Sequence, residues 1–277
     1  MRAVLVTGAG RGIGAAVALR LAERGWRVYA GVRKIADGEA LAERHAGIVP
    51  VVLDITDAGQ IAALDEILPE ELDAIVNNAG IVVDGPVETL TVPALREQFE
   101  VNVFGTLAVT QAVLPRLRKS KGRIVFLSSL SGRISTPGTG AYNSSKFALE
   151  GLADALRIEL RPWRIPVSLV EPGPTDTDMW GGALDMVDAG LERLTPAQRA
   201  LYGSQLTGMR RMAAQVQKVA APVRTVVDDV ERALTARRPR ARYVVGVAGK
   251  AQVVATALTP TPVLDLLLAF ASGIRRR

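Results

Sequence analysis

Cysteine is absent from this chain of 277 residues, and histidine occurs once. Without cysteine the chain can form neither a disulfide bond nor a metal site built on thiolates. The single histidine, His45, lies in the segment ERHAG, where we expect a surface position at a helix end rather than a metal ligand or a base. If the protein is an enzyme, its chemistry must therefore depend on other side chains.

Aromatic residues and long apolar runs are also scarce. Aromatics make up 4% of the chain, which argues against a stacking platform for single-stranded nucleic acid. The most apolar late stretch, 251–274, is interrupted by Pro260, Pro262 and Asp265, so a membrane-spanning helix is not expected. Residues 1–6 run directly into a glycine loop and are typical of a first strand rather than a secretory signal. We therefore predict a cytoplasmic protein, and leave open a peripheral contact of its C-terminal segment with anionic membrane.

The charge balance is basic. The formal net charge is +6 and the isoelectric point is about 10.0, with small basic clusters at 116–121, 237–242 and 275–277. Such a surface can attract nucleic acid, acidic lipid or a phosphorylated cofactor. No base-reading motif accompanies the clusters, so we expect no nucleic-acid partner.

Short apolar runs alternate with stretches of helical periodicity along the whole chain, and 48% of the residues are hydrophobic. This alternation predicts an α/β fold in a single domain over 1–277: a doubly wound, Rossmann-type parallel sheet of about seven strands with helices on both faces. The pattern becomes irregular over 175–222, which we interpret as a lid over a substrate pocket, and 250–277 forms a C-terminal extension. The expected strands are 3–6, 27–31, 49–53, 74–78, 123–129, 166–172 and 241–246; the expected helices are 12–24, 37–44, 58–68, 92–120 and 142–161.

The segment TGAGRGIG, residues 7–14, follows the first expected strand and opens a helix. Gly8, Gly12 and Gly14 allow a tight turn, close approach of backbone to a pyrophosphate, and close packing of helix on strand. The free N–H groups and the dipole of the helix N-terminus would then face the phosphates. In this context the loop, with Gly10 and Ile13, predicts a dinucleotide site.

The residues around the second expected strand indicate which dinucleotide binds. An acidic residue after this strand would bind the ribose hydroxyls of NAD, but here Val32 is followed by Arg33, and Arg11 lies within the glycine loop. Two guanidinium groups suit a dianionic 2′-phosphate, so we predict NADP(H) in preference to NAD(H). The alternative is that both arginines are solvated surface charges.

The segment YNSSK places Tyr142 and Lys146 one helical turn apart, on one face. A nearby ammonium and a cationic nicotinamide would favour tyrosinate and lower the pKa of the tyrosine, which could then exchange a proton with a carbonyl or alcohol oxygen. Ser129, thirteen residues earlier at a strand end, could hydrogen-bond the same oxygen. The spacing of tyrosine and lysine alone is weak evidence for catalysis. The serine and the glycine loop at the matching positions of the chain strengthen that evidence.

Taken together, TGxxxGxG, NNAG, the serine with YxxxK, and EPGPTDT resemble the short-chain dehydrogenase/reductase family over roughly residues 3–178. The resemblance implies a catalytic tetrad of Asn102, Ser129, Tyr142 and Lys146, with the active serine at Ser129 and not Ser128. Asn102 would distort its helix and hold a water through its main chain. Lys146 would also hold the hydroxyls of the nicotinamide ribose.

The resemblance also implies further contacts to the cofactor. Asp54 and its neighbour Ile55 would lie at the adenine, although Asp54 could instead cap a helix, a role for which Thr56 competes. Glu171 stands where the family more commonly has asparagine, a difference expected to alter local hydrogen bonding. Among the residues implied to line the cofactor are Asn78, Ala79, Gly80, Tyr142, Lys146, Pro172, Gly173, Thr175 and Thr177, with Thr177 at the carboxamide.

The layout looks most like the branch near steroid and retinol dehydrogenases, which implies a bulky apolar alcohol or ketone as substrate. Apolar residues in 175–222, including Trp180 and Met209, could line the pocket or simply pack as core. A homodimer or homotetramer is implied through the helices that carry Asn102 and Tyr142. The alternative to an enzyme is an NADP(H)-binding regulatory or scaffold protein on the same fold.

Overall fold

A seven-stranded parallel sheet forms the centre of the molecule, in the order β3-β2-β1-β4-β5-β6-β7. The computed structural model describes residues 1–176, 188, 190, 192, 194–218 and 220–274. All seven expected strands are present, with ends that agree to within about two residues, which confirms the doubly wound sheet in one domain. The strands are β1 (Ala3–Thr7), β2 (Arg27–Val32), β3 (Ile48–Val52), β4 (Ala74–Asn77), β5 (Arg123–Leu127), β6 (Val167–Glu171) and β7 (Arg242–Val244).

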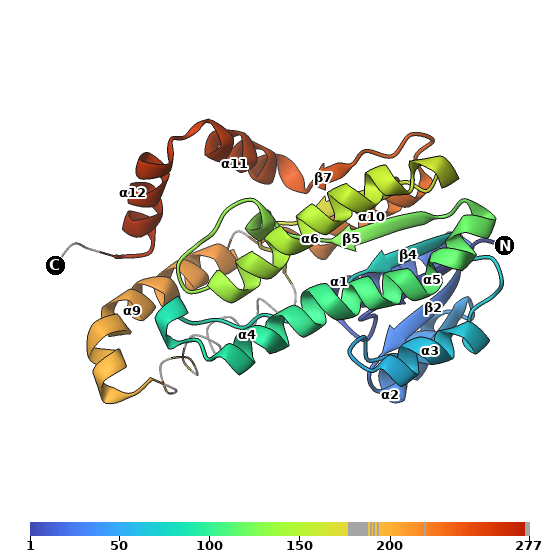
Figure 1. Ribbon diagram of the computed structural model, residues 1–277, viewed down its shortest axis with the longest axis horizontal. Coiled ribbons are helices and arrows are strands. Elements are labelled where there is room, and N and C mark those ends of the chain that lie inside the picture. Colours follow the sequence, from blue (N-terminus) through green and yellow to red (C-terminus); the bar gives the residue numbers. More distant parts are fainter. Residues whose placement is uncertain (177–187, 189, 191, 193, 219, 275–277) are drawn as a thin grey trace.

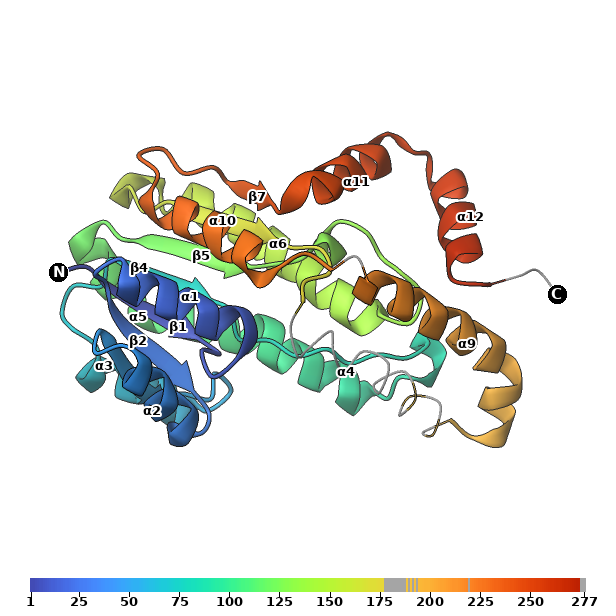
Figure 2. The same cartoon turned by 180° about the vertical axis from the view of Figure 1, so that it is seen from behind.

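Helices cover both faces of the sheet (Figure 1, Figure 2). In β1, Val4 and Val6 point into one apolar layer and Leu5 into the other, because successive side chains of a strand alternate between faces. Both layers are apolar, so the strands are continuous apolar runs rather than alternating ones. The first layer contains α1 (Gly12–Glu23), α2 (Ile35–Arg44) and α10 (Val223–Thr235); the second contains α3 (Ala58–Ile67), α5 (Thr106–Ser120) and α6 (Gly140–Glu159).

The winding of the sheet reverses between β1 and β4. The chain winds from β1 outward to β3 and then returns to β4 on the other side of β1. Ligands of such sheets bind at the carboxyl ends of the strands where the order reverses. The glycine loop after β1 and the NNAG segment after β4 meet at this point.

The helix expected over 92–120 is interrupted. The structure has α4 (Val92–Phe99), a π-helical turn η2 (Glu100–Gly105) and then α5. Gly105 explains the tight packing of this turn, because a Cβ there would lie 2.4 Å from the carbonyl oxygen of Ile55. The distortion implied for the helix around Asn102 is thus present, and such π-turns occur often at functional sites. Three short 3-10 turns complete this half: η1 (Val87–Thr89), η3 (Leu130–Gly132) and η4 (Arg161–Trp163).

The C-terminal third adds helices beyond the sheet: α9 (Pro196–Lys218), α11 (Gly246–Leu258) and α12 (Thr261–Ala271). In both ribbon views α11 and α12 project from the body at the end of β7, and α12 returns toward α9 (Figure 1, Figure 2). The return is anchored by close backbone packing, since a Cβ at Gly208 would lie 2.2 Å from the carbonyl oxygen of Ser272. Among the described residues, no helix combines the length and apolarity needed to cross a bilayer.

Candidate active site

The glycine loop and the segment after β4 are locked together by hydrogen bonds. The side chain of Asn78 donates from Nδ2 to the carbonyl oxygens of Thr7 and Gly8, at 3.0 Å each. The Thr7 hydroxyl accepts from the backbone N–H groups of Asn78 and Ala79. Gly8 and Gly12 have φ values of +64° and +59°, in the left-handed region that favours glycine. These contacts fix a turn that only a glycine-rich sequence can form.

The start of α1 is open to an anion. Arg11 occupies the N-cap position without a side-chain hydrogen bond, so the first N–H groups of the helix remain uncapped by it. Gly14 permits close contact beneath the turn, because a Cβ there would lie 2.3 Å from the Gly8 carbonyl oxygen and 2.4 Å from Asn78 Nδ2. A turn with bare backbone at a helix N-terminus fits a pyrophosphate.

Replacing Gly14 by alanine is expected to lower the free energy of unfolding by roughly 3 kcal/mol, because the new methyl group overlaps backbone that cannot move aside. Gly151 is the matched control: it lies exposed in α6, and a Cβ there meets nothing within 4 Å. Gly151→Ala should leave the chain as stable or up to about 1 kcal/mol more so. Urea unfolding of both variants tests the packing, and equal stabilities would contradict it.

Arg11 and Arg33 are both exposed near this loop, and Val32 is buried at the end of β2. Arg33 lies close enough to Asp54 to help lower the pKa of that carboxyl group. An acidic neighbour that the sequence interpretation missed is Asp37, in the first turn of α2: a Cβ at Gly10 would lie 3.2 Å from its Oδ2. The site therefore combines two guanidinium groups with one carboxylate.

The alternative role for Asp54, as a helix cap, is wrong. Asp57 caps α3 by accepting from the backbone N–H groups of Gly59 and Gln60 at 2.8 and 3.0 Å. Asp54 instead accepts from the backbone N–H and the hydroxyl of Thr56, and these bonds lower the pKa of its carboxyl group. Its carboxylate is thus charged and half-buried at the carboxyl end of β3, next to the buried Ile55.

Asn102 is buried in the π-turn, and its side chain is fully engaged. Its Oδ1 accepts from the Ile81 N–H at 2.8 Å, and its Nδ2 donates to the Ile81 carbonyl and to Ser145 Oγ. Any role toward water would therefore fall to its main chain. Gln98, which the sequence interpretation missed, supports the same segment by accepting from the Val83 N–H at 2.6 Å. The bond to Ser145 joins Asn102 to α6.

The structure brings Ser129, Tyr142 and Lys146 together. Lys146 Nζ donates to the carbonyl oxygen of Leu127 at 2.7 Å and lies 5.7 Å from the centre of the Tyr142 ring. The Ser129 hydroxyl donates to the Pro172 carbonyl at 3.4 Å and lies close enough to Tyr142 to influence its pKa. Proton exchange and hydrogen bonding to one substrate oxygen are therefore geometrically compatible.

Burial dominates the electrostatics of this group. Burial raises the pKa of Tyr142, and the nearby Ser129 hydroxyl opposes that rise. Burial lowers the pKa of Lys146 to about 8, and Glu150 opposes that fall. The lowered pKa expected for Tyr142 is therefore not produced by the protein's own groups, because desolvation outweighs them. A lower pKa for Tyr142 requires further positive charge beside that of Lys146, which an oxidised nicotinamide would supply.

The turn after β6 forms the adjoining wall. The Pro172 carbonyl accepts from the Leu130 N–H at 3.0 Å, and a Cβ at Gly173 would lie 3.1 Å from Leu130 Cδ1. Thr175 is buried, and its hydroxyl donates to the Gly173 carbonyl. Thr177 lies outside the described residues. The turn thus packs directly against the segment that carries Ser129.

Comparison with known proteins agrees with this geometry. Residues 2–187 match the family model of short chain dehydrogenases. The chain is 34% identical to the NADPH-dependent 3-dehydrocapnine reductase of Ornithobacterium rhinotracheale, over 96% of this chain and 95% of that protein. It is 33% identical to retinol dehydrogenase 5 of Mus musculus, over 96% and 87%. A short chain dehydrogenase from Burkholderia cenocepacia, solved in complex with NADP, superposes with a TM-score of 0.75 at 30% identity, covering 97% of this chain and 99% of that one.

Proposed function

The chain belongs to the short-chain dehydrogenase family of oxidoreductases, and we propose that it uses NADP(H) to interconvert a bulky apolar alcohol and the corresponding ketone or aldehyde. The observation that carries the proposal is the grouping of Ser129, Tyr142 and Lys146 beside the Pro172 turn, at the same sheet edge as the glycine loop. When bound, the nicotinamide supplies or accepts the hydride.

In this proposal Tyr142 moves the proton. Its hydroxyl donates to the carbonyl oxygen during reduction and accepts from the alcohol during oxidation. Ser129 donates a hydrogen bond to the same oxygen and stabilises the charge that develops there. Lys146, fixed by the Leu127 carbonyl, favours tyrosinate through its positive charge and holds ribose hydroxyls. Asn102 orders the π-turn whose main chain would support a water for proton return.

The preference for NADP(H) rests on Arg11 and Arg33, whose exposed guanidinium groups flank the position expected for the adenosine ribose. An always-charged planar group binds phosphate oxygens in a bidentate manner. An NADP-bound neighbour of similar fold and a relative named for its use of NADPH support the same choice. The adenine would lie near Asp54 and Ile55, and the nicotinamide near Gly173 and Thr175.

The lid would be built on α9. Met209 packs on the loop before α6, where a Cβ at Gly138 would lie 2.4 Å from its sulfur atom. The Tyr202 hydroxyl donates to Glu88 in η1, so α9 contacts both η1 and the loop that leads into α6, the helix of Tyr142. Met209 is buried with Leu194 and Leu206, which places apolar surface on this side of the site. Trp180, another candidate for the pocket, lies outside the described residues.

A homo-oligomer would form through α4, α5 and α6. Phe104, in the π-turn, is 52% exposed, and Phe147, one residue after Lys146, is 44% exposed. These aromatic side chains lie on the segments that carry Asn102 and Tyr142. Large exposed aromatics on ordered helices mark association surfaces. Their position supports a homodimer or homotetramer.

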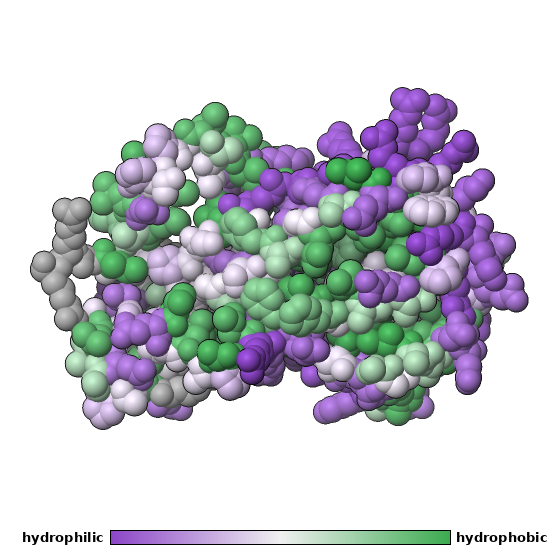
Figure 3. Space-filling model, in the orientation of Figure 1, coloured by the Kyte–Doolittle hydropathy of each residue, from purple (hydrophilic) through white to green (hydrophobic). Residues whose placement is uncertain are grey.

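A peripheral membrane contact would use α11 and α12. Figure 3 shows hydrophobic residues gathered over these helices, at the upper left of the view. Leu266 and Phe270 are 71% and 86% exposed, and three arginines follow in the sequence at 275–277. Apolar side chains followed by basic residues suit an anionic bilayer surface. A cytoplasmic location remains a prediction.

The test is turnover across a panel of ketones and aldehydes of increasing apolar size, followed by the loss of NADPH absorbance. We expect kcat/KM to rise with apolar size by about tenfold or more for each pair of buried methylene groups, since each contributes about 0.8 kcal/mol of transfer free energy. A rate that is independent of size would contradict the apolar pocket. Tight NADPH binding without turnover in either direction would favour the regulatory or scaffold protein instead.

A further inference from the structure

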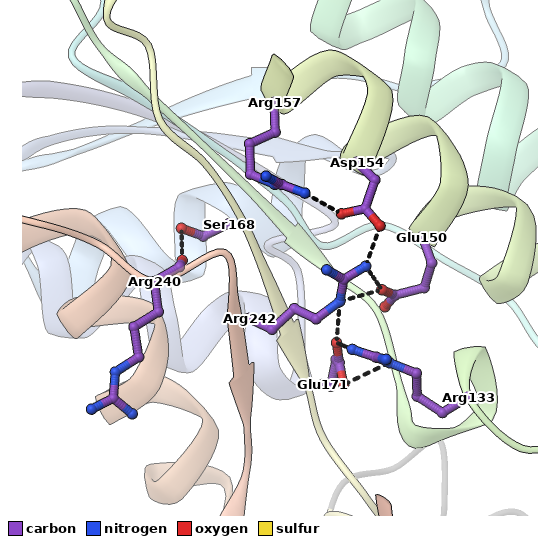
Figure 4. Close-up of polar contacts among 8 residues, drawn as sticks. All are labelled: Arg133, Glu150, Asp154, Arg157, Ser168, Glu171, Arg240 and Arg242. Carbon is purple, nitrogen blue, oxygen red and sulfur yellow. Dashed lines mark hydrogen bonds and ion pairs between the residues drawn. The ribbon is translucent and has the colours of Figure 1, made fainter. Parts of the chain in front are cut away.

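A cluster of charged side chains lies directly behind the active site, and Figure 4 shows its members. Glu171, at the end of β6, is fully buried. Arg133, just after η3, donates to both of its carboxylate oxygens, at 3.2 and 2.9 Å. Arg242 on β7 approaches the same carboxylate at 3.2 Å. The difference at Glu171 from the commoner asparagine is thus matched by two arginines.

Arg242 extends the cluster to α6. It donates to Glu150 Oε2 at 3.1 Å and to Asp154 Oδ2 at 2.6 Å, and Asp154 also accepts from Arg157 at 2.8 Å. We call Arg133, Glu150, Asp154, Glu171 and Arg242 the Arg242 cluster. It joins three parts of the site: the helix with Tyr142, the segment with Ser129, and the turn after β6.

Glu150 is the member nearest the proposed chemistry. It lies one helical turn beyond Lys146 and two beyond Tyr142, so all three share one face of α6. It is buried beside Gly132, where a Cβ would lie 3.0 Å from Glu150 Cγ, 3.1 Å from Ser128 Oγ and 3.3 Å from the Lys146 carbonyl oxygen. Its Oε1 is buried without a hydrogen bond among the described residues. The Glu150 side chain therefore lies between the backbone of Lys146 and the Arg242 guanidinium.

The pKa values of Glu150 and Lys146 depend on the charged groups around them. Burial raises the pKa of Glu150, and Glu171 adds to that rise. Ser128, Arg242 and Arg133 oppose it: the Ser128 hydroxyl lies close enough to favour the carboxylate, although its geometry is not that of a good hydrogen bond. Glu150 in turn opposes the fall that burial causes in the pKa of Lys146. Arg242 and Arg133 thus favour the charged form of Glu150 against burial, and Glu150 favours the charged form of Lys146.

We propose that Glu150, held by Arg242 and on the same face of α6 as Lys146, is a positioning residue of the reaction, which acts on Tyr142 through Lys146. The inference rests on the proposed function and adds to it a dependence on a side chain that touches neither substrate nor cofactor. A merely structural salt bridge would stabilise the fold without setting the charge of Lys146.

The direct test is the titration of Lys146 in the protein without substrate. The chain has six lysines, so NMR with ε-¹³C-lysine resolves each, and Lys146→Arg assigns the signal. We expect one lysine to titrate near its pKa of about 8. In Glu150→Gln this titration moves to lower pH, because the opposing negative charge is gone. Asp154→Asn, which also contacts Arg242 but lies two turns from Lys146, should leave it in place.

The second readout is the pH profile of kcat/KM for alcohol oxidation. A less charged Lys146 favours tyrosinate less. In Glu150→Gln the rise of kcat/KM with pH should therefore occur at higher pH. Each pH unit of this shift lowers kcat/KM at neutral pH about tenfold. A purely structural role would instead lower the rate equally at every pH. Glu150→Asp keeps the carboxylate, so the rise of kcat/KM should return most of the way to its wild-type pH.

A Lys146 titration in Glu150→Gln at the pH found in the wild-type chain would overturn the inference. Glu150→Met, an apolar side chain of similar length, gives the same test if the glutamine variant does not fold. The two proposals fail separately. A wild-type chain without turnover would contradict the proposed function, whereas the lysine titration still decides the role of Glu150.

Discussion

Replacing Tyr142 by phenylalanine is expected to lower kcat by about three orders of magnitude, because the proposed proton donor is lost while the ring remains. The ring packs 5.7 Å from Lys146 Nζ, and the phenylalanine preserves that contact. NADPH affinity should change little, since Lys146 stays fixed by the Leu127 carbonyl. Steady-state kinetics, together with calorimetric titration of NADPH, measures the two effects separately.

Ser144→Ala provides the matched control for this variant. It removes a hydroxyl from the same helical turn, but Ser144 is exposed and its hydroxyl bonds only locally, to the Ala141 carbonyl. We expect wild-type kinetics from it. A phenylalanine variant that keeps more than about a tenth of the wild-type kcat would show that another group moves the proton.

Replacing both Arg11 and Arg33 by serine is expected to weaken NADPH binding by about 10²- to 10⁴-fold and to leave NADH binding nearly unchanged. Each arginine would lose a charge-assisted hydrogen bond to the 2′-phosphate, worth about 1.5–3 kcal/mol. Asp37, beside Gly10, places a negative charge near the same loop. Asp37→Asn should therefore strengthen NADPH binding, whereas the two arginine replacements weaken it.

Arg27→Ser separates a local phosphate contact from the overall charge of the chain. Arg27 is exposed like Arg33 but begins β2, whereas Arg33 follows the opposite end of that strand. Its replacement removes an equal charge and should change NADPH affinity only through weak, salt-dependent long-range attraction. Equal losses from Arg27→Ser and Arg33→Ser would contradict the assignment, as would a double variant that still prefers NADPH.

The sheet and the glycine loop could be predicted because their signals are local. Each strand is a short apolar run, and both faces are covered, so the run itself is the signal. The loop glycines follow the first strand directly, and the structure shows why: Gly8 has a positive φ, and Gly14 has no room for a Cβ. The break at Asn102 was available only through the family resemblance, since periodicity continues across it.

The supporting contacts could not be predicted because they join residues far apart in the chain. Glu150 and Arg242 are separated by 92 residues, and Asn78 and Gly8 by 70. Nothing in the local pattern distinguishes Gln98, buried under the Ile81 segment, from an ordinary helix-surface glutamine. The helix cap was misplaced for a related reason, because three acceptors in DITD compete and only packing selects Asp57.

The most direct test of the central claim is transfer of deuterium from NADPH labelled at the hydride-donating carbon of the nicotinamide ring. Product alcohols from a panel of apolar ketones and aldehydes would be analysed by mass spectrometry, with labelled NADH and Tyr142→Phe in parallel. The account predicts deuterium on the carbinol carbon with the wild-type chain, faster from NADPH than from NADH, and nearly none with the phenylalanine variant. Tight NADPH binding with no transfer to any carbonyl, and no reduction of NADP by the matching alcohols, would contradict it.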